Sequence, residues 1–259
     1  MKWFIMRNIV SSMVIVLIGL SSLEAATIVV PSPGRNTIQE AINQAQEGDT
    51  IVISPGRYQE NLIIDGKSIN LESKNPGKAA ILDGGNKGPC LILKNGSSGK
   101  IQGLIIQNGN AGGNKGEGGG IACYQSNPKI VRNTFRNNVA DQGLGGGIFC
   151  CQSAPVIDKN AFYNNRAEQG EGSGIFAFRS TPVIRYNTFV ENQAEQGEGG
   201  AISLLESTGQ INDNSFMNNL ANQGKDVYLQ HSKGNMKNNL HGNGTDPYKE
   251  AVFLNQSTW

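Results

Sequence analysis

The chain has 259 residues, of which 34 are glycine and only 17% are charged, and its formal net charge is +1. This balance argues against the broad basic surface that nucleic-acid binding requires, and it gives no sign of an acidic partner. An unbroken internal repeat leaves no linker between residue 27 and the C-terminal tail. We therefore predict one elongated domain over residues 27–259.

Residues 1–26 have the pattern of a secretory signal peptide. Lys2 and Arg7 precede an apolar segment from Ile9 to Leu20, and small residues follow it. This order predicts cleavage after Ala25 or Ala26. The apolar segment is too short, and too interrupted by serine, for a permanent membrane span, so none is predicted in the mature chain. The predicted location is secreted, periplasmic or at the cell surface.

A short helix from about Ile38 to Gln46 is predicted next, and Gly48-Asp49-Thr50 is interpreted as its exit into the first strand. Short strands are predicted from about Thr50 to Leu229. The helix is expected to cover the N-terminal end of the strand stack, where unpaired backbone and apolar core would otherwise face water.

The central region repeats with a period of 27 residues, from about residue 116 to residue 224. Gly, Pro and Asn break every apolar run after three to five residues, which excludes helices there. A strict period predicts stacked coils of short parallel strands, since one unit cannot bury its own apolar face. Two columns of residues one coil apart are predicted to form the core: Ile121, Ile148, Ile175 and Ile202, and Phe135, Phe162, Phe189 and Phe216.

Two polar columns accompany the apolar ones. Stacked coils lie about 4.8 Å apart, so asparagine amides in register can hydrogen-bond along the stack. Asparagine also suits tight bends, and a ladder combined with turn formation is the predicted role. The columns are Asn133, Asn160, Asn187 and Asn214, and Asn138, Asn165, Asn192 and Asn219.

These features resemble the right-handed parallel β-helix proteins of the pectin-lyase-like superfold. The Thr37–Ile42 segment, Gly48-Asp49-Thr50 and Gly56-Arg57-Tyr58 are similar to the capping helix and first coils of that fold. The pairing of Gly118-Gly119-Gly120-Ile121 with Phe135-Arg136-Asn137-Asn138 is similar to the GGAI and FxxN repeats of chlamydial polymorphic outer-membrane proteins. The resemblance implies an all-β, single-stranded, right-handed parallel β-helix solenoid with a short N-terminal capping helix.

The tail from about residue 226 to residue 259 departs from the 27-residue period. Val227-Tyr228-Leu229 is predicted to be one more strand, and Ala251-Val252-Phe253-Leu254 is predicted to cap the open end. A cap is needed because an uncovered terminal coil exposes unpaired backbone and apolar core.

The resemblance raises the question of activity, because the superfold includes pectate lyases, pectin methylesterases and polygalacturonases. Their chemistry requires paired carboxylates, or a basic residue beside carboxylate-bound calcium. The repeats are regular and contain none of these families' catalytic motifs, so no catalytic residue is predicted. Glu171, Glu198 and Arg179 are the candidates for a hidden site if the chain is an enzyme.

Acidic residues recur along one edge of the predicted coils. Glu168 and Glu195 share one column with Asp141, and Glu171 and Glu198 share another. The simpler interpretation is a solvated edge of glycine-rich loops. The alternative is a ridge on which facing carboxylates bind calcium, although no calcium-loop motif is present.

Strand alternation predicts an exposed strip of aromatic residues. If Ile121 and its column face inward, Tyr124, Phe149, Phe176 and Phe178 face outward. Exposed aromatic strips suit sugar rings and protein partners, so these four residues are the predicted ligand-binding candidates. The alternative is a slip in this register, or burial of the strip beneath the tail.

Cys123 and Cys150 are one period apart, which places their Cα atoms within the range of a disulfide. Their Cβ atoms point the same way, and this arrangement equally suits stacked reduced thiols. Both alternatives stay open at the level of sequence.

Two hypotheses for function follow. The first is a secreted, non-catalytic β-helix that acts as an adhesin or binds a glycan or a cell-surface partner. The second is a polysaccharide-active enzyme, a lyase or hydrolase on uronic-acid polymers, with a hidden site. The regularity of the repeats favours the first hypothesis. No cofactor is predicted, apart from the calcium considered above.

Overall fold

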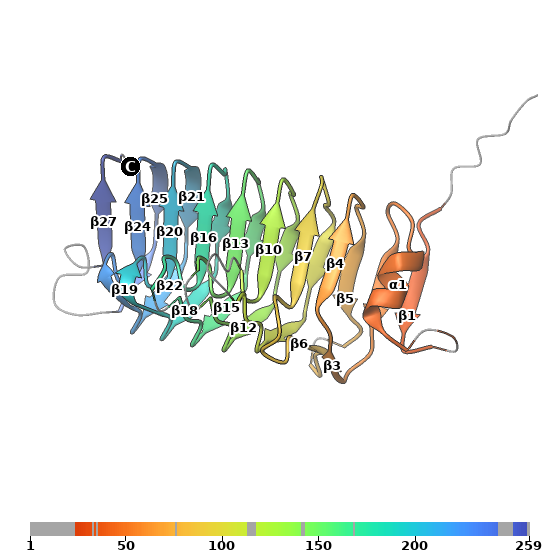
Figure 1. Ribbon diagram of the computed structural model, residues 1–259. Helices are drawn as coiled ribbons and strands as arrows, with labels where there is room; N and C mark the ends of the chain where they lie inside the picture. The colour runs from red at the N-terminus through yellow and green to blue at the C-terminus, as the bar shows by residue number, and fades with distance from the viewer. Residues whose placement is uncertain are drawn as a thin grey trace, which may run out of the picture.

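The computed structural model describes residues 24–32, 34, 36–75, 77–112, 118–140, 143–167, 169–242 and 251–257. The chain forms a right-handed solenoid in which successive coils contribute strands to three long sheets (Figure 1). Every pairing between strands is parallel, as shown by the register of neighbouring coils; Ile121, for example, lies opposite Leu91 on one side and Ile148 on the other. The predicted fold class is confirmed.

Sheet 1 contains eight strands and lies nearest the viewer in Figure 1. Its strands are β4 (Leu62–Asp65), β7 (Leu91–Lys94), β10 (Ile121–Tyr124), β13 (Ile148–Cys151), β16 (Ile175–Phe178), β20 (Ile202–Leu205), β24 (Val227–Gln230) and β27 (Val252–Asn255).

Sheet 2 contains nine strands and follows sheet 1 within most coils. Its strands are β1 (Thr27–Val30), β2 (Thr50–Ile53), β5 (Asn70–Ser73), β8 (Lys100–Gln102), β11 (Lys129–Val131), β14 (Val156–Asp158), β17 (Val183–Arg185), β21 (Thr208–Asn212) and β25 (Lys233–Lys237).

Sheet 3 contains eight strands and completes each coil. Its strands are β3 (Arg57–Gln59), β6 (Ile81–Asp83), β9 (Ile105–Gln107), β12 (Thr134–Arg136), β15 (Ala161–Tyr163), β18 (Thr188–Val190), β22 (Ser215–Met217) and β26 (Leu240–His241). Two further strands, β19 (Gln193–Glu198) and β23 (Leu220–Gln223), pair with each other in the loops that lead from sheet 3 to sheet 1.

The core is a set of stacked apolar columns between the three sheets. Phe135 and Phe162 stack with ring centroids 4.8 Å apart, and Phe162 and Phe189 stack at 4.7 Å. The stack continues through Phe216 and ends in His241, whose ring lies 5.0 Å from that of Phe216. These separations equal the spacing of adjacent strands, so the predicted phenylalanine column is confirmed.

The asparagine columns form the predicted ladders. The Oδ1 atom of Asn160 accepts from the backbone N–H of Asn133 at 2.8 Å and from its Nδ2 at 3.2 Å. Asn138 bonds to Asn165 in the same way, at 3.2 and 3.0 Å. Because both ladders are buried, each amide satisfies backbone groups at a bend that would otherwise lack partners.

A third ladder, which the sequence did not reveal, is made of serines at the turn from sheet 1 to sheet 2. The hydroxyl of Ser153 accepts from the N–H of Ser126 at 3.1 Å and donates to the carbonyl of Cys151 at 2.9 Å. The same pattern recurs through Ser180 and Ser207. The serine ladder holds one polar corner of the solenoid in register.

Helix α1 (Ile38–Gln44) lies across the N-terminal end of the strand stack, as predicted (Figure 1). Thr37 and Glu40 form a capping box at its start. Glu60 accepts from the N–H groups of Ile38 and Gln39 at 2.9 and 3.1 Å, which anchors the helix to the first coil.

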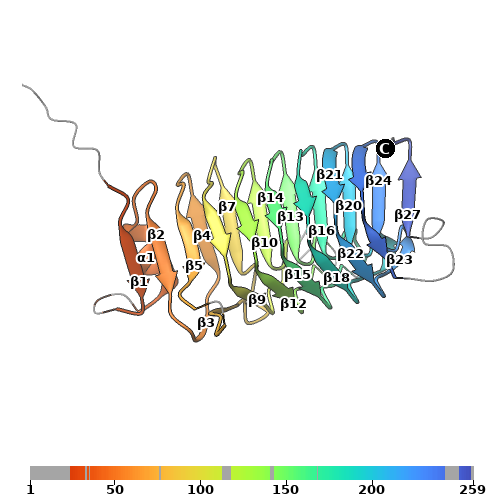
Figure 2. The ribbon, with the colours of Figure 1, turned by 180° about the vertical axis from the view of Figure 1, so that it is seen from behind.

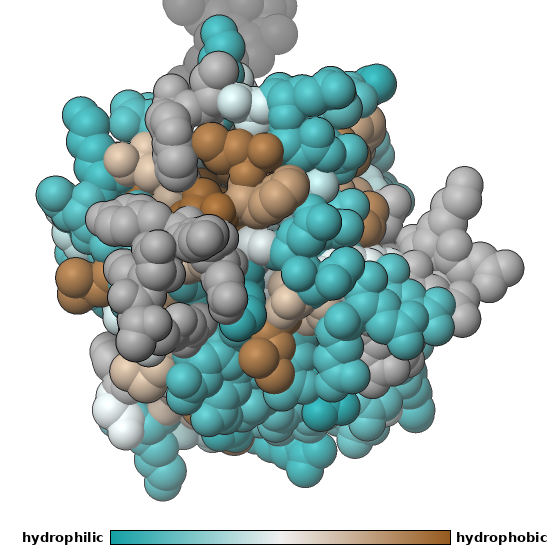
Figure 3. Space-filling model, turned by 90° about the vertical axis from the view of Figure 1, so that its left-hand side faces the viewer, coloured by the Kyte–Doolittle hydropathy of each residue, from teal (hydrophilic) through white to brown (hydrophobic). Residues whose placement is uncertain are grey.

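The tail extends the solenoid further than predicted. The step along sheet 1 is 27 residues from Ile121 to Ile148 and 25 residues from Ile202 to Val227, and β24, β25 and β26 continue all three sheets. β27 is the last strand of sheet 1. Figure 3 looks onto this end of the solenoid, where apolar side chains gather among hydrophilic ones; Val252 is buried and Phe253 is 38% exposed.

Cys123 and Cys150 lie opposite each other in β10 and β13, and both are buried free thiols. The contact with Cys123 and the burial of the site both raise the pKa of Cys150 well above its usual value. Of the two arrangements considered for this pair, the structure contains the stacked thiols.

Candidate functional site

The turns that follow the strands of sheet 1 lie along the upper edge of the solenoid in Figure 2. From β10 onward, each of these turns begins with one long polar side chain. All of them are exposed and have left-handed backbone, with φ between 47° and 51°. We call this set the corner column: Gln125, Gln152, Arg179, Glu206, His231 and Gln256.

The corner column arises from how the chain bends. The residue at the bend directs its N–H to the next coil; Gln125 N–H donates to the carbonyl of Cys151, and Gln152 N–H donates to that of Phe178, both at 3.0 Å. These bonds offset the strain of left-handed backbone in a residue other than glycine. The side chain is left to project into solvent, so identical bends stack polar groups about 4.8 Å apart.

Side chains of the corner column bond in pairs. Gln125 donates to Gln152 (Nε2 to Oε1, 3.2 Å), and Arg179 donates to Glu206 (Nε to Oε2, 2.7 Å). His231 pairs with Gln256 at 2.5 Å. The amides of the first pair keep further donor and acceptor capacity, because one hydrogen bond uses only one of an amide's two N–H groups.

A shallow groove of about 530 Å³ runs beside the corner column. Gln125, Gln152 and Arg179 lie on one side of it, and Asn127, Ala154 and Thr181 lie two residues further along the chain. Ser153, from the serine ladder, also lines it. The groove offers amide, hydroxyl and guanidinium groups at the spacing of the coils, and its lining contains no carboxylate and no histidine.

Two of the predicted ligand-binding rings lie close to this groove in sequence. Tyr124 and Phe178 directly precede Gln125 and Arg179 and are half-buried. The guanidinium of Arg179 lies over the ring of Phe178, 4.7 Å from its centroid. Neither ring lines the groove itself, and Phe178 reaches its edge only through its contact with Arg179.

The other two predicted rings are buried. Phe149 is 2% exposed and Phe176 is 0% exposed, so the prediction that they form part of an exposed strip is wrong. Strand alternation does turn both away from the main core, whose apolar cluster includes neither. The preceding turns cover them: a Cβ atom added at Gly145 or Gly172 would lie 3.0 Å from the Cα of Phe149 or Phe176.

Glu171 occupies the same covering turn. Its Oε2 accepts from the hydroxyl of Ser203 at 2.9 Å, and Ser203 stands one coil after Phe176 in the same column. Burial raises the pKa of Glu171, and the Glu198 carboxylate raises it further, whereas the bond from Ser203 lowers it. Glu171 is therefore a partly buried carboxyl group whose pKa lies above its ordinary value.

Calcium binding by the acidic edge stays a prediction. Glu168 lies outside the described residues, Glu195 is exposed, and Glu198 is half-buried on the coil after Glu171. Within the described part of the chain, no three His, Cys, Asp or Glu side chains come together as metal ligands.

The residues considered for a hidden catalytic site do not form one unit. Arg179 bonds to Glu206 at the end of β16, whereas Glu171 bonds to Ser203 in the turn before that strand. These two partners lie at opposite ends of β20.

A buried carboxylate in the first coils has a structural role. Asp83 is fully buried and accepts from Arg57 at 3.0 Å, Asn108 at 2.8 Å and the N–H of Gly85 at 2.9 Å, as well as from Gln107. Burial raises the pKa of Asp83, but these hydrogen bonds outweigh that effect and the pKa is lowered. An ionised carboxylate with so many donors joins strands β3, β6 and β9 and has little capacity for a substrate.

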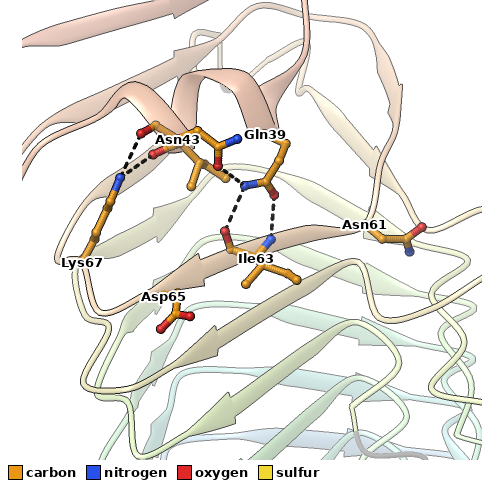
Figure 4. A pocket seen from close by; sticks show the side chains of 7 residues that line it. Gln39, Asn43, Asn61, Ile63, Asp65 and Lys67 are labelled. Atoms are coloured by element: carbon orange, nitrogen blue, oxygen red, sulfur yellow. Dashed lines mark hydrogen bonds between the residues drawn. The ribbon is translucent and has the colours of Figure 1, made fainter.

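The hollow beneath helix α1 is also structural (Figure 4). The amide of Gln39 donates to the carbonyl of Ile63 at 3.2 Å and accepts from its N–H at 2.8 Å, as a neighbouring strand would. The ammonium of Lys67 donates to three carbonyls at the end of the helix. Asp65 pairs with Lys94 at 3.1 Å. The polar groups of this hollow are thus already paired: Gln39 and Lys67 hold the helix on the first coil, and Asp65 joins β4 to β7.

Comparisons with known proteins agree with this architecture. A family model described as a right-handed β-helix region matches residues 85–245, which is more than half of the chain. No curated protein matches the chain in sequence. Within the described residues, no helix is long and apolar enough to cross a membrane.

Three of the solved structures that match the chain illustrate the low level of similarity. An alginate lyase of the PL6 family is 14% identical with a TM-score of 0.37, and the match covers 88% of this chain but only 40% of the lyase. The Escherichia coli protein YbhC is 11% identical with a TM-score of 0.45, with 99% and 86% covered. A pectin methylesterase variant in complex with a hexasaccharide is 11% identical with a TM-score of 0.40, with 90% and 78% covered.

Of the residues that line the groove, only Arg179 was named from the sequence, and it was named as part of a hidden catalytic site. Gln125 and Gln152 are one period apart and directly follow outward-facing strand residues. That repetition of long amides at a bend was the available signal. The signal is weak because glutamine is an ordinary surface residue, and two copies one period apart are typical of any repeat.

Proposed function

Since the chain belongs to the family of right-handed β-helix regions, we propose that it is a non-catalytic carbohydrate-binding protein, with the groove beside the corner column as its binding surface. Sugars present hydroxyl groups that donate and accept hydrogen bonds, and apolar ring faces that pack on aromatic side chains. The groove offers the hydrogen-bonding contacts along the axis of the solenoid, and the ring of Phe178 lies at its edge, against the guanidinium of Arg179.

The repetition of groups along the groove carries this proposal. Gln125 and Gln152, and Asn127 and Ala154, are equivalent positions of successive coils. Gln152 can therefore meet one unit of an extended polymer in the same way as Gln125 meets the unit one coil earlier, and Asn127 and Thr181 add an amide and a hydroxyl two coils apart. A preformed array of this kind loses little conformational entropy on binding.

The lining of the groove supports the absence of catalysis. Hydrolysis of a glycosidic bond requires a pair of carboxyl groups flanking it, and elimination requires a general base. Neither a carboxylate nor a histidine lines this groove. The arrangement can bind and orient a polymer, and the carboxylate beside it, that of Glu206, is paired with Arg179 rather than with a second carboxyl group.

We propose further that the chain is exported, on the basis of the signal-peptide pattern of residues 1–26. Expression in a bacterial host, followed by fractionation and mass measurement, tests this. The expected product is an extracytoplasmic chain that begins near Thr27. Retention of the uncleaved chain in the cytoplasm would contradict export without affecting the proposed binding surface.

The binding proposal is tested by screening the purified chain on a glycan array and measuring affinity by calorimetry. In the groove, Gln152→Ala combined with Thr181→Ala is expected to weaken binding at least tenfold, which corresponds to about 1.4 kcal/mol. Tyr186→Ala is the matched control, because Tyr186 is 51% exposed on the bend between sheets 2 and 3. Unchanged binding by the double variant would refute the proposed surface.

One observation favours an enzyme as a second candidate. Glu171 has a raised pKa, as general acids of glycosidases do, and Glu198 is close enough to contribute to that shift. This candidate predicts release of reducing ends or unsaturated products from a polysaccharide, and loss of that turnover in Glu171→Gln. If the chain does not turn over the polymer that the groove binds, the enzyme hypothesis is refuted and the non-catalytic binding function is retained.

A further inference from the structure

The charge of the groove indicates which class of carbohydrate it accepts, on the premise that the proposed binding function is correct. Of its seven lining residues, only Arg179 is charged. The other six are amides, hydroxyl-bearing side chains and an alanine. A polymer with one carboxylate on every sugar would need several cations along its path, and this groove supplies one.

That single cation is already neutralised. The Nε of Arg179 lies 2.7 Å from Oε2 of Glu206, and the two side chains are 56% and 45% exposed. The guanidinium also lies over the ring of Phe178, which holds it toward the strand. A uronate carboxylate approaching Arg179 would meet the Glu206 carboxylate as well, and repulsion at one coil spacing is about 1 kcal/mol in water.

The neutral part of the groove is better equipped for hydroxyl groups. Gln125 uses one N–H of its amide on Gln152, which leaves its second N–H and its carbonyl oxygen for a ligand. Asn127 accepts from the N–H of Ala154 at 2.6 Å through its Oδ1, which anchors the side chain of an exposed residue that still carries two Nδ2 donors. Amides both donate and accept, as sugar hydroxyls do.

We propose that the groove binds a neutral, hydroxyl-rich polysaccharide that lies along the solenoid axis, and that the Arg179–Glu206 pair discriminates against polyuronates. Successive sugars are bonded by Gln125, Gln152 and Thr181 at about the 4.8 Å coil spacing. Discrimination arises from Glu206, which removes the only attraction for anionic sugars and adds a repulsive group.

Calorimetry with a set of polymers tests the proposal: neutral glucan, mannan and xylan against polygalacturonate and alginate, each at low and high ionic strength. A neutral polymer is expected to bind at least tenfold more tightly than either polyuronate. Its affinity is expected to be insensitive to salt, because no net charge is neutralised on binding.

A charge variant makes the test specific. Glu206→Gln is expected to free Arg179 and to narrow the preference for neutral polymer severalfold by strengthening polyuronate binding. Glu195→Gln changes the net charge equally at an exposed site in β19, and it is expected to leave the preference unchanged. Circular dichroism confirms that both variants are folded.

The outcomes separate the two proposals. Tighter, salt-sensitive binding of a polyuronate at the groove would overturn the inference on ligand class while leaving carbohydrate binding intact. An unchanged preference in Glu206→Gln would also overturn it. Failure of every polymer to bind would refute the proposed function itself, and the inference with it.

Discussion

Two sets of side chains point away from the core of the solenoid, and only one of them reaches solvent. Phe149 and Phe176 project from the outer face of sheet 1 and are buried under glycine-rich turns. Gln125 and Gln152 project from the bend that follows the same sheet and are exposed. In a coiled chain, the direction of a side chain and its exposure are therefore separate questions, because a long turn from the previous sheet can fold over a strand.

The two regions differ in the length of chain that enters them. The bend after β13 is short, and the serine ladder holds it close to the strands. The passage from β12 to β13 is much longer and contains glycines such as Gly145 that lie directly on sheet 1. The short bend leaves its side chains free for a ligand, whereas the long turn builds a second layer.

The largest expected effect is on the covered face. Phe176→Ala should lower the free energy of unfolding by about 3–5 kcal/mol, because it removes a fully buried ring that stacks on Phe149 with centroids 5.8 Å apart. Phe178→Ala, two residues away and half-buried, should cost clearly less. Chemical denaturation measures both, and equal losses would contradict the contrast between the two regions.

The covering turn itself should be the next most sensitive feature. Gly172 has a φ of +63°, and an added Cβ would lie 2.4 Å from the carbonyl oxygen of Ile175, so Gly172→Ala should destabilise the fold by about 1–3 kcal/mol. Gly96 is the control, since it has a φ of +80° with nothing within 4 Å of an added Cβ. The loss of unfolding free energy in Gly96→Ala should report the backbone strain alone. The additional loss in Gly172→Ala then measures the steric clash.

A smaller effect is expected at the carboxyl group in this turn. The folded-state pKa of Glu171 is raised, so its stabilising contribution is complete below the ordinary carboxyl pKa and is lost as pH rises through the folded-state value. Glu171→Gln should therefore raise the free energy of unfolding at neutral pH by less than about 1 kcal/mol. The gain should disappear below about pH 4. Denaturation curves at both pH values decide this, and a destabilised variant at neutral pH would show that the charge is needed.

The smallest effect on stability is expected at the open bend. Gln152→Ala should change the free energy of unfolding by no more than about 0.5 kcal/mol, because its side chain is exposed and makes one hydrogen bond to Gln125. A loss comparable to that of Phe176→Ala would mean that the corner column supports the fold. Its proposed role in binding would then have to be measured in a stabilised background.

The repeat made most of the fold predictable. Positions such as Phe135 and Asn138 recur at one spacing, and a residue that stacks on its own copies has few environments open to it. The coil boundaries beyond Leu229 were harder to place, because the step shortens to 25 residues at Val227 and the repeated landmarks change.

The candidate site was less predictable for a physical reason. The sequence predicts that the side chains of Ile175 and Phe176 face opposite sides of their strand. It does not show where the turn containing Gly172 will lie. Exposure depends on that tertiary contact. Conversely, the ordinary amides of Gln125 and Gln152 become a groove only when the bends stack, and no single residue among them has an unusual chemical type.

Gln39 has a consequence for assembly. The two ends of a parallel solenoid are complementary, so the last coil of one molecule can pair with the first coil of another, and repetition of this open contact produces a fibre. At the start of sheet 1, the amide of Gln39 already occupies the N–H and carbonyl of Ile63 that an incoming strand would use. A side chain on a helix of seven residues thus opposes head-to-tail polymerisation at this edge.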